Sequence, residues 1–259
     1  MNNKLQYCYH THTSRCGHAF GNDEEYVKSA IKFGIKRLGF SDHIIFPKGY
    51  EQPTIRGSYD VLDDYLLSIK SLKEKYKSQI EILVGFEAEY FPDMIGYYKE
   101  LLDKKVDYLI LGQHCRMVNS QYTWYFDGHC FKIEEYVNDV IEGMRTGLFT
   151  YFAHPDFFMR CFSEWNKDIE MYSRRILEVC EELDIPIEIN ICGMRRDDYK
   201  EDGLAYPHYH FFQLAKEYKV RTIIGIDAHA PEHFNQVDVD KCFEFIKKYD
   251  LKIIDDYKI

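Results

Sequence analysis

The sequence lacks the features that mark disulfide-stapled, membrane-spanning and secreted proteins. It has eight cysteines in 259 residues, but none forms a C-x-x-C pair, and the chain is too long to be a small domain held by disulfides. No apolar run approaches the roughly 18 residues of a membrane-spanning helix. No apolar segment typical of a secretory signal follows Met1. These absences predict a cytoplasmic protein with free thiols and no membrane partner.

Positive charge is also scarce. The chain has 33 Lys and Arg against 43 Asp and Glu, a formal net charge of −10, and no strip rich in Lys or Arg. A protein that binds nucleic acid needs a basic face to displace counterions, so we expect no nucleic-acid partner. A small anionic substrate is still compatible with this charge, because a bound metal ion can reverse the local field.

Three common catalytic motifs are missing as well. There is no G-x-x-x-x-G-K-[ST] phosphate loop, no G-x-S-x-G nucleophile elbow, and no cysteine followed six residues later by arginine. Ser14 is interpreted as a turn residue and not as a catalytic nucleophile. A hydrolytic reaction on this chain would therefore use water activated by a metal as its nucleophile.

Short β-branched and aromatic segments alternate with longer amphipathic segments along the whole chain. Strands are predicted at 5–9, 37–40, 81–86, 108–111, 150–153, 187–191 and 221–226, and helices at 23–33, 59–76, 94–104, 133–146, 168–183, 207–218 and 239–249. Strand–helix units repeated seven times predict a parallel sheet with helical crossovers. No linker or repeat divides the chain, so we expect one α/β domain over residues 1–259, either a barrel or an open doubly wound sheet.

Side chains that bind metals follow six of the seven predicted strands. They are His10, His12 and His18 after the first, His43, Glu87, His114 and His154 after the next four, and Asp227 and His229 after the last. Parallel strands place their carboxyl ends on one face, where barrel enzymes carry out their chemistry. Imidazole and carboxylate suit Zn, Mn or Fe, and nine donors exceed the four of one tetrahedral zinc. We expect two to three divalent transition-metal ions. The other histidines, His129, His208, His210 and His233, are interpreted as loop residues.

These motifs resemble those of the polymerase-and-histidinol-phosphatase (PHP) superfamily. Residues 10–19, 85–92 and 151–156 are similar, more specifically, to its histidinol-phosphatase branch. The resemblance implies a distorted (β/α)7 TIM-like barrel with a trinuclear metal centre. It assigns His10, His12, Glu87 and Asp227 to one metal, Glu87, His114 and His154 to a second, and His18, His43 and His229 to the third. Glu89 competes with Glu87 but suits an outer position, and Asp42 and Asp156 are expected to orient imidazoles.

A phosphate substrate also needs fixed cations, for which arginine is the preferred residue because its planar fork holds two phosphate oxygens. Arg160, in the loop after His154, is the first candidate. Arg195 and Arg196 are second, and Arg15 and Arg116 lie in other loops of the same predicted face. Each of them competes with the simpler interpretation of a solvated loop charge.

The resemblance implies a metal-dependent phosphomonoesterase that hydrolyses L-histidinol phosphate in histidine biosynthesis. A bridging hydroxide would attack phosphorus, Arg160 would balance the transition-state charge, and Asp227 or His229 would protonate the leaving alkoxide. Acidic residues at the rim (Glu89, Asp93, Asp156) would attract the substrate amine. Two alternatives stay open: a PHP phosphoesterase for another small phosphomonoester or nucleotide, and a non-catalytic metal-binding module. The oligomeric state is not predicted.

Overall fold

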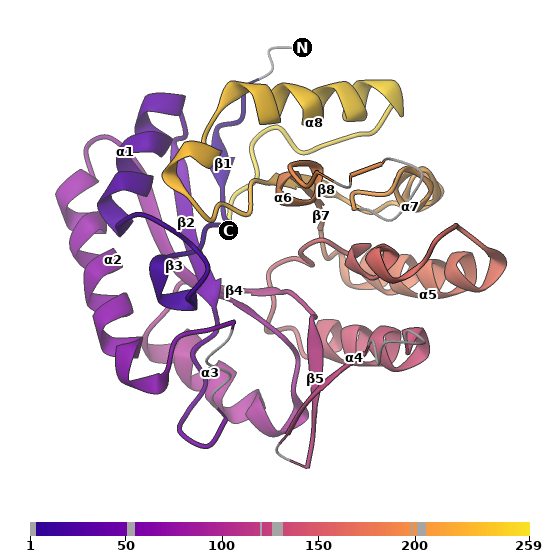
Figure 1. Ribbon diagram of the computed structural model, residues 1–259, viewed down its shortest axis with the longest axis horizontal. Helices are drawn as coiled ribbons and strands as arrows, with labels where there is room; N and C mark the ends of the chain where they lie inside the picture. The colour runs from indigo at the N-terminus through magenta and orange to yellow at the C-terminus, as the bar shows by residue number, and fades with distance from the viewer. Residues whose placement is uncertain (1–3, 51–54, 120, 126–131, 198, 201–205) are drawn as a thin grey trace.

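The computed structural model describes residues 4–50, 55–119, 121–125, 132–197, 199–200 and 206–259. Its centre is a ring of parallel strands, surrounded by helices (Figure 1). The parallel strands are β1 (Tyr7–Cys8), β2 (Arg37–His43), β3 (Glu81–Ala88), β4 (Tyr108–Leu111), β7 (Ile187–Asn190) and β8 (Thr222–Gly225). They form one run in the order β1-β2-β3-β4 and a second run of β7 and β8.

Three isolated bridges join these two runs into a closed ring. Phe152 pairs in parallel with Leu111 of β4 on one side and with Ile187 of β7 on the other. Thr11, just beyond β1, pairs with Ala228, just beyond β8. The segment predicted as a strand at 150–153 therefore fills the position between β4 and β7, although only Phe152 bridges its neighbours. The prediction of a distorted (β/α)7 barrel is confirmed.

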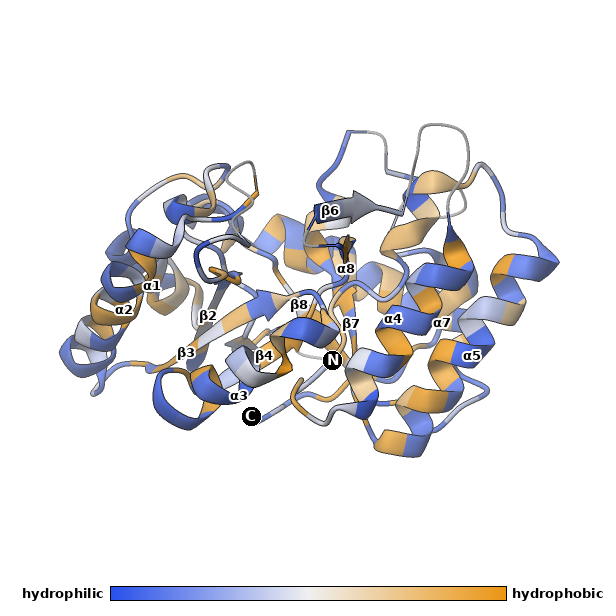
Figure 2. Cartoon of the chain, turned by 90° about the horizontal axis from the view of Figure 1, so that it is seen from below, coloured by the Kyte–Doolittle hydropathy of each residue, from blue (hydrophilic) through white to orange (hydrophobic). Residues whose placement is uncertain are grey.

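The helices cover the outside of the ring. They are α1 (Asp23–Phe33), α2 (Leu62–Tyr76), α3 (Ile95–Lys104), α4 (Ile133–Arg145), α5 (Lys167–Leu183), α7 (Tyr209–Ala215) and α8 (Gln236–Lys248). Hydrophobic and hydrophilic residues are interleaved along α4 and α5, as expected for helices with one buried face (Figure 2). Asn22 and Glu25 form a capping box at the start of α1. Helix α8 begins earlier than predicted because the Asn235 side chain caps it by accepting from the Asp238 N–H.

Several shorter elements were not predicted from the sequence. β5 (Cys115–Val118) and β6 (Gln121–Trp124) form an antiparallel hairpin after β4, and α6 (Ile191–Met194) follows β7 directly. The 3₁₀ helices of the described residues are η1 (Ser14–Cys16), η2 (Tyr59–Val61), η3 (Pro92–Met94), η4 (Phe157–Cys161) and η5 (Pro231–His233), of which η2 lies within the helix predicted at 59–76 and η3 ends where the helix predicted at 94–104 begins. All cysteines of the described part are free. Within the same part, no helix has both the length and the apolar character needed to cross a membrane.

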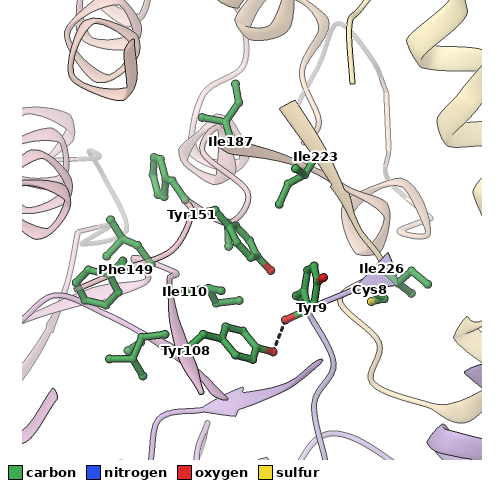
Figure 3. Close-up of a cluster of buried hydrophobic side chains, with 14 of the residues drawn as sticks. Cys8, Tyr9, Tyr108, Ile110, Phe149, Tyr151, Ile187, Ile223 and Ile226 are labelled. Atoms are coloured by element: carbon green, nitrogen blue, oxygen red, sulfur yellow. Dashed lines mark hydrogen bonds between the residues drawn. The ribbon is translucent and has the colours of Figure 1, made fainter. Parts of the chain in front are cut away.

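Tyrosines fill the interior of the barrel. Tyr108 crosses it and donates a hydrogen bond from its hydroxyl to the Tyr9 carbonyl at 2.8 Å (Figure 3). Tyr257, in the C-terminal tail, packs against Tyr9 and donates to the carbonyl of Thr150 at 3.3 Å. Because Thr150 lies at the start of its strand segment, the tail contacts the amino ends of the strands. The carboxyl ends on the other side are free to carry a site.

Gly85 of β3 makes room for the Tyr108 ring. A Cβ atom at this position would lie 2.5 Å from Cε1 of Tyr108, closer than real Cβ contacts allow. We expect Gly85→Ala to lower the free energy of unfolding by about 1–3 kcal/mol, the usual cost of overpacking a core. Gly96→Ala is the control, since a Cβ there meets nothing within 4 Å in helix α3, and alanine favours helix. Urea unfolding of both variants measures this difference. Equal stability of Gly85→Ala and the unsubstituted protein would contradict it.

Candidate metal centre

The structure brings the nine predicted metal ligands together at the carboxyl ends of the strands. Donor atoms within 4.8 Å of one another form overlapping groups: His10–His12–Asp227, His10–Glu87–His154, His12–His43–Glu87 and His18–His43–His229. Eight of the nine line one cavity of about 280 Å³, and His10 is fully buried. The convergence that the strand-end pattern predicts is therefore present in the fold.

Glu87 of β3 is the centre of this cluster. Five imidazole nitrogens lie within 3.5 Å of its carboxylate: His154 Nε2 at 2.7 Å and His114 Nε2 at 3.5 Å from Oε1, and His43 Nδ1 at 3.1 Å, His12 Nε2 at 3.5 Å and His10 Nε2 at 3.5 Å from Oε2. Burial alone would raise the pKa of Glu87, but the imidazoles, led by His114 and His10, hold it well below its ordinary value. A carboxylate whose two oxygens face different groups of histidines is suited to bridge two metal ions.

Asp227 completes the group around His10 and His12. Its Oδ1 lies 3.1 Å from His12 Nε2, 3.6 Å from His10 Nε2 and 3.3 Å from His229 Nδ1. Asp227 has φ +50° and His154 has φ +31°, in the left-handed region that side chains other than glycine rarely adopt. Strained backbone of this kind persists where surrounding contacts fix it, and it is concentrated at functional sites.

The third group consists of imidazoles alone. The ring centroids of His18 and His229 are 4.8 Å apart, and those of His18 and His43 are 5.3 Å apart. His18 is exposed, whereas His43 is buried. Burial and neighbouring histidines hold the pKa of His18 below its ordinary value, and burial holds that of His43 well below, although Glu87 opposes it. The rings of His18 and His43 are therefore neutral near pH 7, the form in which imidazole binds a metal.

Several donor atoms at the centre make no hydrogen bond within the protein. His10 Nε2, His12 Nε2 and Asp227 Oδ1 are buried, and each lacks a partner of hydrogen-bonding geometry. Buried polar atoms are normally paired, because leaving one unpaired costs about 1–3 kcal/mol. A divalent cation accepts lone pairs from nitrogen and oxygen together, so this donor set fits metal ions of the Zn, Mn and Fe type.

A ring of carboxylates lies behind the imidazoles. Asp42 Oδ1 lies 3.5 Å from His12 Nδ1 without forming a hydrogen bond to it, and accepts instead from the backbone N–H of His43 at 2.9 Å. Glu89 accepts from His114 Nδ1 at 3.0 Å, on the side of that ring away from Glu87, so it lies outside the ligand cluster. Asp156 differs from the prediction: it accepts from the backbone N–H of His208.

The predicted acidic rim is wrong. Glu89 and Asp156 are fully buried, and Asp93 does not line the cavity. Burial raises the pKa of Asp156 to about 7, so it is not a fixed anion at neutral pH. The charge of Glu89 is paired with Arg56 at 3.0 Å. These three acids therefore present no anionic surface to a substrate amine.

Among the five candidate arginines, the structure places only Arg160 in the wall of the cavity. It is exposed on η4, with its guanidinium 5.3 Å from the centre of the Phe157 ring. Arg195 donates to the carbonyls of Ile226 and Asp227, each at 2.9 Å, and so supports the backbone after β8.

The other three arginines lie away from the cavity, which corrects the expectation that they surround it. Arg15 pairs with Asp23 at 2.9 Å and with Asp64 at 2.7 Å. Arg116 pairs with Glu135 at 2.8 Å and with Asp139 at 3.2 Å. Arg196 lines a separate surface pocket beside Lys241 and Glu244. Arginine position in the sequence does not reveal these pairings, because the acidic partners of Arg15 and Arg116 lie 8 to 49 residues away along the chain.

Sequence reasoning missed four residues that support the centre. Glu188 and Asn190 of β7 contact ligands, Arg56 is 1% exposed and pairs with Glu89, and His233 Nδ1 accepts from the backbone N–H of His229 at 3.0 Å. Glu188 and Asn190 alternate along a strand end as His10 and His12 do, a signal that could have found them. Arg56 has no such signal. His208 is fully buried and stacks on Trp165, and His129 lies outside the described residues.

Metal binding to this centre should release protons. Burial lowers the pKa of His10 and His12, but the neighbouring carboxylates outweigh it, raising that of His12 to about 9 and that of His10 well above its ordinary value. Both rings are thus protonated at pH 7 in the metal-free protein and must lose their protons to bind metal. We expect zinc affinity to rise with pH up to about 9. Calorimetric titration in buffers of different ionisation enthalpy measures the released protons, and zero release at pH 7 would contradict the expectation.

Comparison with known proteins agrees with this geometry. The "Probable histidinol-phosphatase" of Deinococcus radiodurans is 28% identical over 234 residues, covering 86% of this chain and 85% of its own. The "Histidinol-phosphatase" of Bacillus subtilis is 25% identical over 250 residues, covering 85% of this chain and 92% of its own. The histidinol phosphate phosphatase of Lactococcus lactis, solved with Zn, L-histidinol and phosphate, has a TM-score of 0.71 at 18% identity, covering 97% of this chain and 95% of that one.

A family model also matches this chain, independently of any single relative. The model of the PHP domain matches residues 9–191 of the 259, from the residue before His10 to the start of α6. It includes the loops that carry seven of the nine candidate ligands, and Asp227 and His229 follow after its end. The resemblance seen in the sequence is confirmed, and the chain belongs to the PHP domain family.

Proposed function

We propose that this protein is a metal-dependent phosphomonoesterase that hydrolyses L-histidinol phosphate to L-histidinol and phosphate. The observation that carries the proposal is the convergence of nine imidazole and carboxylate donors, with Glu87 at their centre, in a cavity whose wall also contains Arg160. Similarity to curated histidinol-phosphatases over most of both chains supports the substrate. One domain over residues 1–259, acting in the cytoplasm without a nucleic-acid partner, stays a prediction from the sequence.

The donor set divides into three metal sites that share residues. His10, His12, Glu87 and Asp227 would hold the first ion, and Glu87 would bridge to a second held by His114 and His154. His18, His43 and His229 would hold the third. Two to three divalent ions of Zn, Mn or Fe would occupy them. When bound, such ions polarise phosphate oxygens and make water a stronger nucleophile at neutral pH.

The chain's own residues would then bind the phosphate and move the protons. Arg160 would hold two phosphate oxygens, with its guanidinium already placed beside Phe157. In the metal-free protein the pKa of Asp227 already lies well below its ordinary value, because the positive charge of His10 and contacts with His12 and His229 outweigh burial. Ionised Asp227 can take a proton from the attacking water and pass it to the leaving alkoxide. His229, whose Nδ1 is 3.3 Å from Asp227 Oδ1, is the alternative carrier.

The rest of the cavity wall suits the organic part of a small substrate. Ile55, Trp124, Phe157 and Tyr206 line it together with the metal ligands. Trp124 comes from the β5–β6 hairpin and is 43% exposed, so its ring is accessible from the cavity mouth. Aromatic and aliphatic walls of this kind accommodate a planar ring such as imidazole, while the metals and Arg160 would hold the phosphate.

A substrate panel tests the proposal directly. We expect kcat/KM for L-histidinol phosphate to exceed that for p-nitrophenyl phosphate and for a mononucleotide by at least about a hundredfold, because a site built for polar groups loses affinity when they are missing. Removing the metals with a chelator should abolish the activity, and adding zinc or manganese should restore it. Equal rates on all three substrates would retain the metallophosphatase and reject the histidinol assignment. Activity that survives complete metal removal would reject both.

Arg160 provides a second test. Arg160→Met should lower kcat by about thirty- to a thousandfold, which corresponds to a charge-assisted contact of about 2–4 kcal/mol made in the transition state. Metal content should not change, because a protonated guanidinium has no lone pair with which to bind a metal ion. Arg145→Met is a suitable control, since Arg145 forms a surface ion pair with Glu182. Steady-state kinetics measures the effect, and an unchanged kcat/KM in Arg160→Met would exclude this role.

A further inference from the structure

The carboxyl end of β7 carries a buried acid that is not one of the nine candidate ligands. Glu188 and Asn190 are alternate residues of this strand, and both are fully buried. Gly225 of the neighbouring strand β8 leaves room for Glu188, since a Cβ at that position would lie 1.7 Å from Glu188 Oε1. A carboxylate is costly to bury, so its position inside the barrel requires compensating contacts.

These contacts all lead to the metal centre. His10 Nδ1 lies 3.0 Å from Glu188 Oε1 and 3.2 Å from Oε2. The backbone N–H of His154 donates to Oε2 at 3.2 Å. Asn190 Nδ2 donates to Glu188 Oε2 at 2.9 Å and to Asp227 Oδ2 at 3.2 Å. Glu188 and Asn190 therefore connect ligands that follow three different strands.

The contact with His10 determines which ring nitrogen faces the centre. Ionised Glu188 is only an acceptor, so His10 Nδ1 must carry the hydrogen of this contact. The lone pair of the neutral ring is then on Nε2, the atom that lies 3.5 Å from Glu87 and 3.6 Å from Asp227 and that has no hydrogen-bond partner. Glu188 thus fixes both the tautomer and the direction of His10.

Glu188 and Glu89, the two glutamates behind the ligand histidines, differ in their ionic partners. Glu89, behind His114, is paired with the buried guanidinium of Arg56 through two contacts of 3.0 Å. Among the described residues, no lysine or arginine forms an ion pair with Glu188, whose ionic contact is with His10. His10 is therefore the ionic partner of Glu188, and a carboxylate hydrogen-bonded to the far nitrogen makes a ligand imidazole a stronger donor.

We propose that Glu188 is a positioning residue that sets the affinity of the first metal site through His10, with Asn190 linking it to Asp227. This rests on the proposed metal-dependent function, because it assigns His10, His12, Glu87 and Asp227 to one ion. The second and third sites do not use the His10 side chain. Loss of the Glu188 charge should therefore weaken one of the bound ions and leave the others in place.

The test is chelator competition on zinc-loaded full-length protein, with released zinc followed by a chromophoric indicator. Glu188→Gln keeps the size of the side chain and removes its charge. We expect one ion per chain to be released at a ten- to a hundredfold lower chelator concentration than in the unsubstituted protein, the range typical for such outer partners. Glu182→Gln, an exposed glutamate paired with Arg145, should release zinc as the unsubstituted protein does.

Three other results would each decide the matter. Unchanged zinc release from Glu188→Gln would overturn the role of Glu188. Release of every ion together with a lower thermal midpoint of the metal-free protein would also overturn it, because a purely structural role predicts that pattern. An unsubstituted protein that binds no zinc, manganese or iron would instead contradict the proposed function.

A second variant keeps the inference testable if Glu188→Gln does not fold. Asn190→Ala leaves Glu188 in place but removes the hydrogen bonds to Glu188 and Asp227. It should weaken the same single ion by a smaller factor than Glu188→Gln. Unchanged affinity for that ion in Asn190→Ala would overturn the proposed link between Glu188 and Asp227.

Discussion

The burial of one carboxylate among five imidazoles is the constraint on which the rest of this structure depends. Glu87 is 1% exposed, and an isolated buried carboxylate would be strongly unfavourable. It is tolerated because five histidines from four other segments turn their nitrogens towards it. Gly112 allows this close packing, since a Cβ there would lie 2.1 Å from Glu87 Oε1. The barrel thus brings distant histidines to one point by surrounding a single acid.

Contacts between buried carboxylates and imidazoles also occur further from the centre. Asp42, Glu89 and Glu188 each lie behind a different imidazole, on the side opposite the cavity. Glu188 accepts from one ring nitrogen of His10, and Glu89 accepts from one ring nitrogen of His114, so that the other nitrogen of each ring faces inward. Negative charge thus accumulates around a set of imidazole nitrogens, an arrangement that favours divalent cations once the rings of His10 and His12 have lost their protons. Arg160 then supplies a fixed positive charge at the wall where an anionic phosphate would enter.

Much of this could be predicted from the sequence because it depends on local patterns. Strand–helix alternation predicted a parallel α/β sheet, the resemblance to the PHP motifs narrowed it to a barrel, and His10, Glu87 and Asp227 were identified as candidate ligands because each follows a strand. What could not be predicted depends on contacts between distant segments. Arg56 looks like any loop arginine until the β5–β6 hairpin and Glu89 enclose it. Arg116 was likewise expected at the cavity from its place in the sequence. Its ion pairs with Glu135 and Asp139 hold it elsewhere.

The central claim is that Glu87 bridges two metal ions at the carboxyl ends of the strands. Anomalous diffraction from crystals grown with zinc or manganese tests it most directly, because the signal locates each ion without reference to activity. The account predicts one ion among His10, His12 and Asp227, a second between His114 and His154, and one oxygen of Glu87 in contact with each. A single ion, or ions that bind without contact to Glu87, would contradict it.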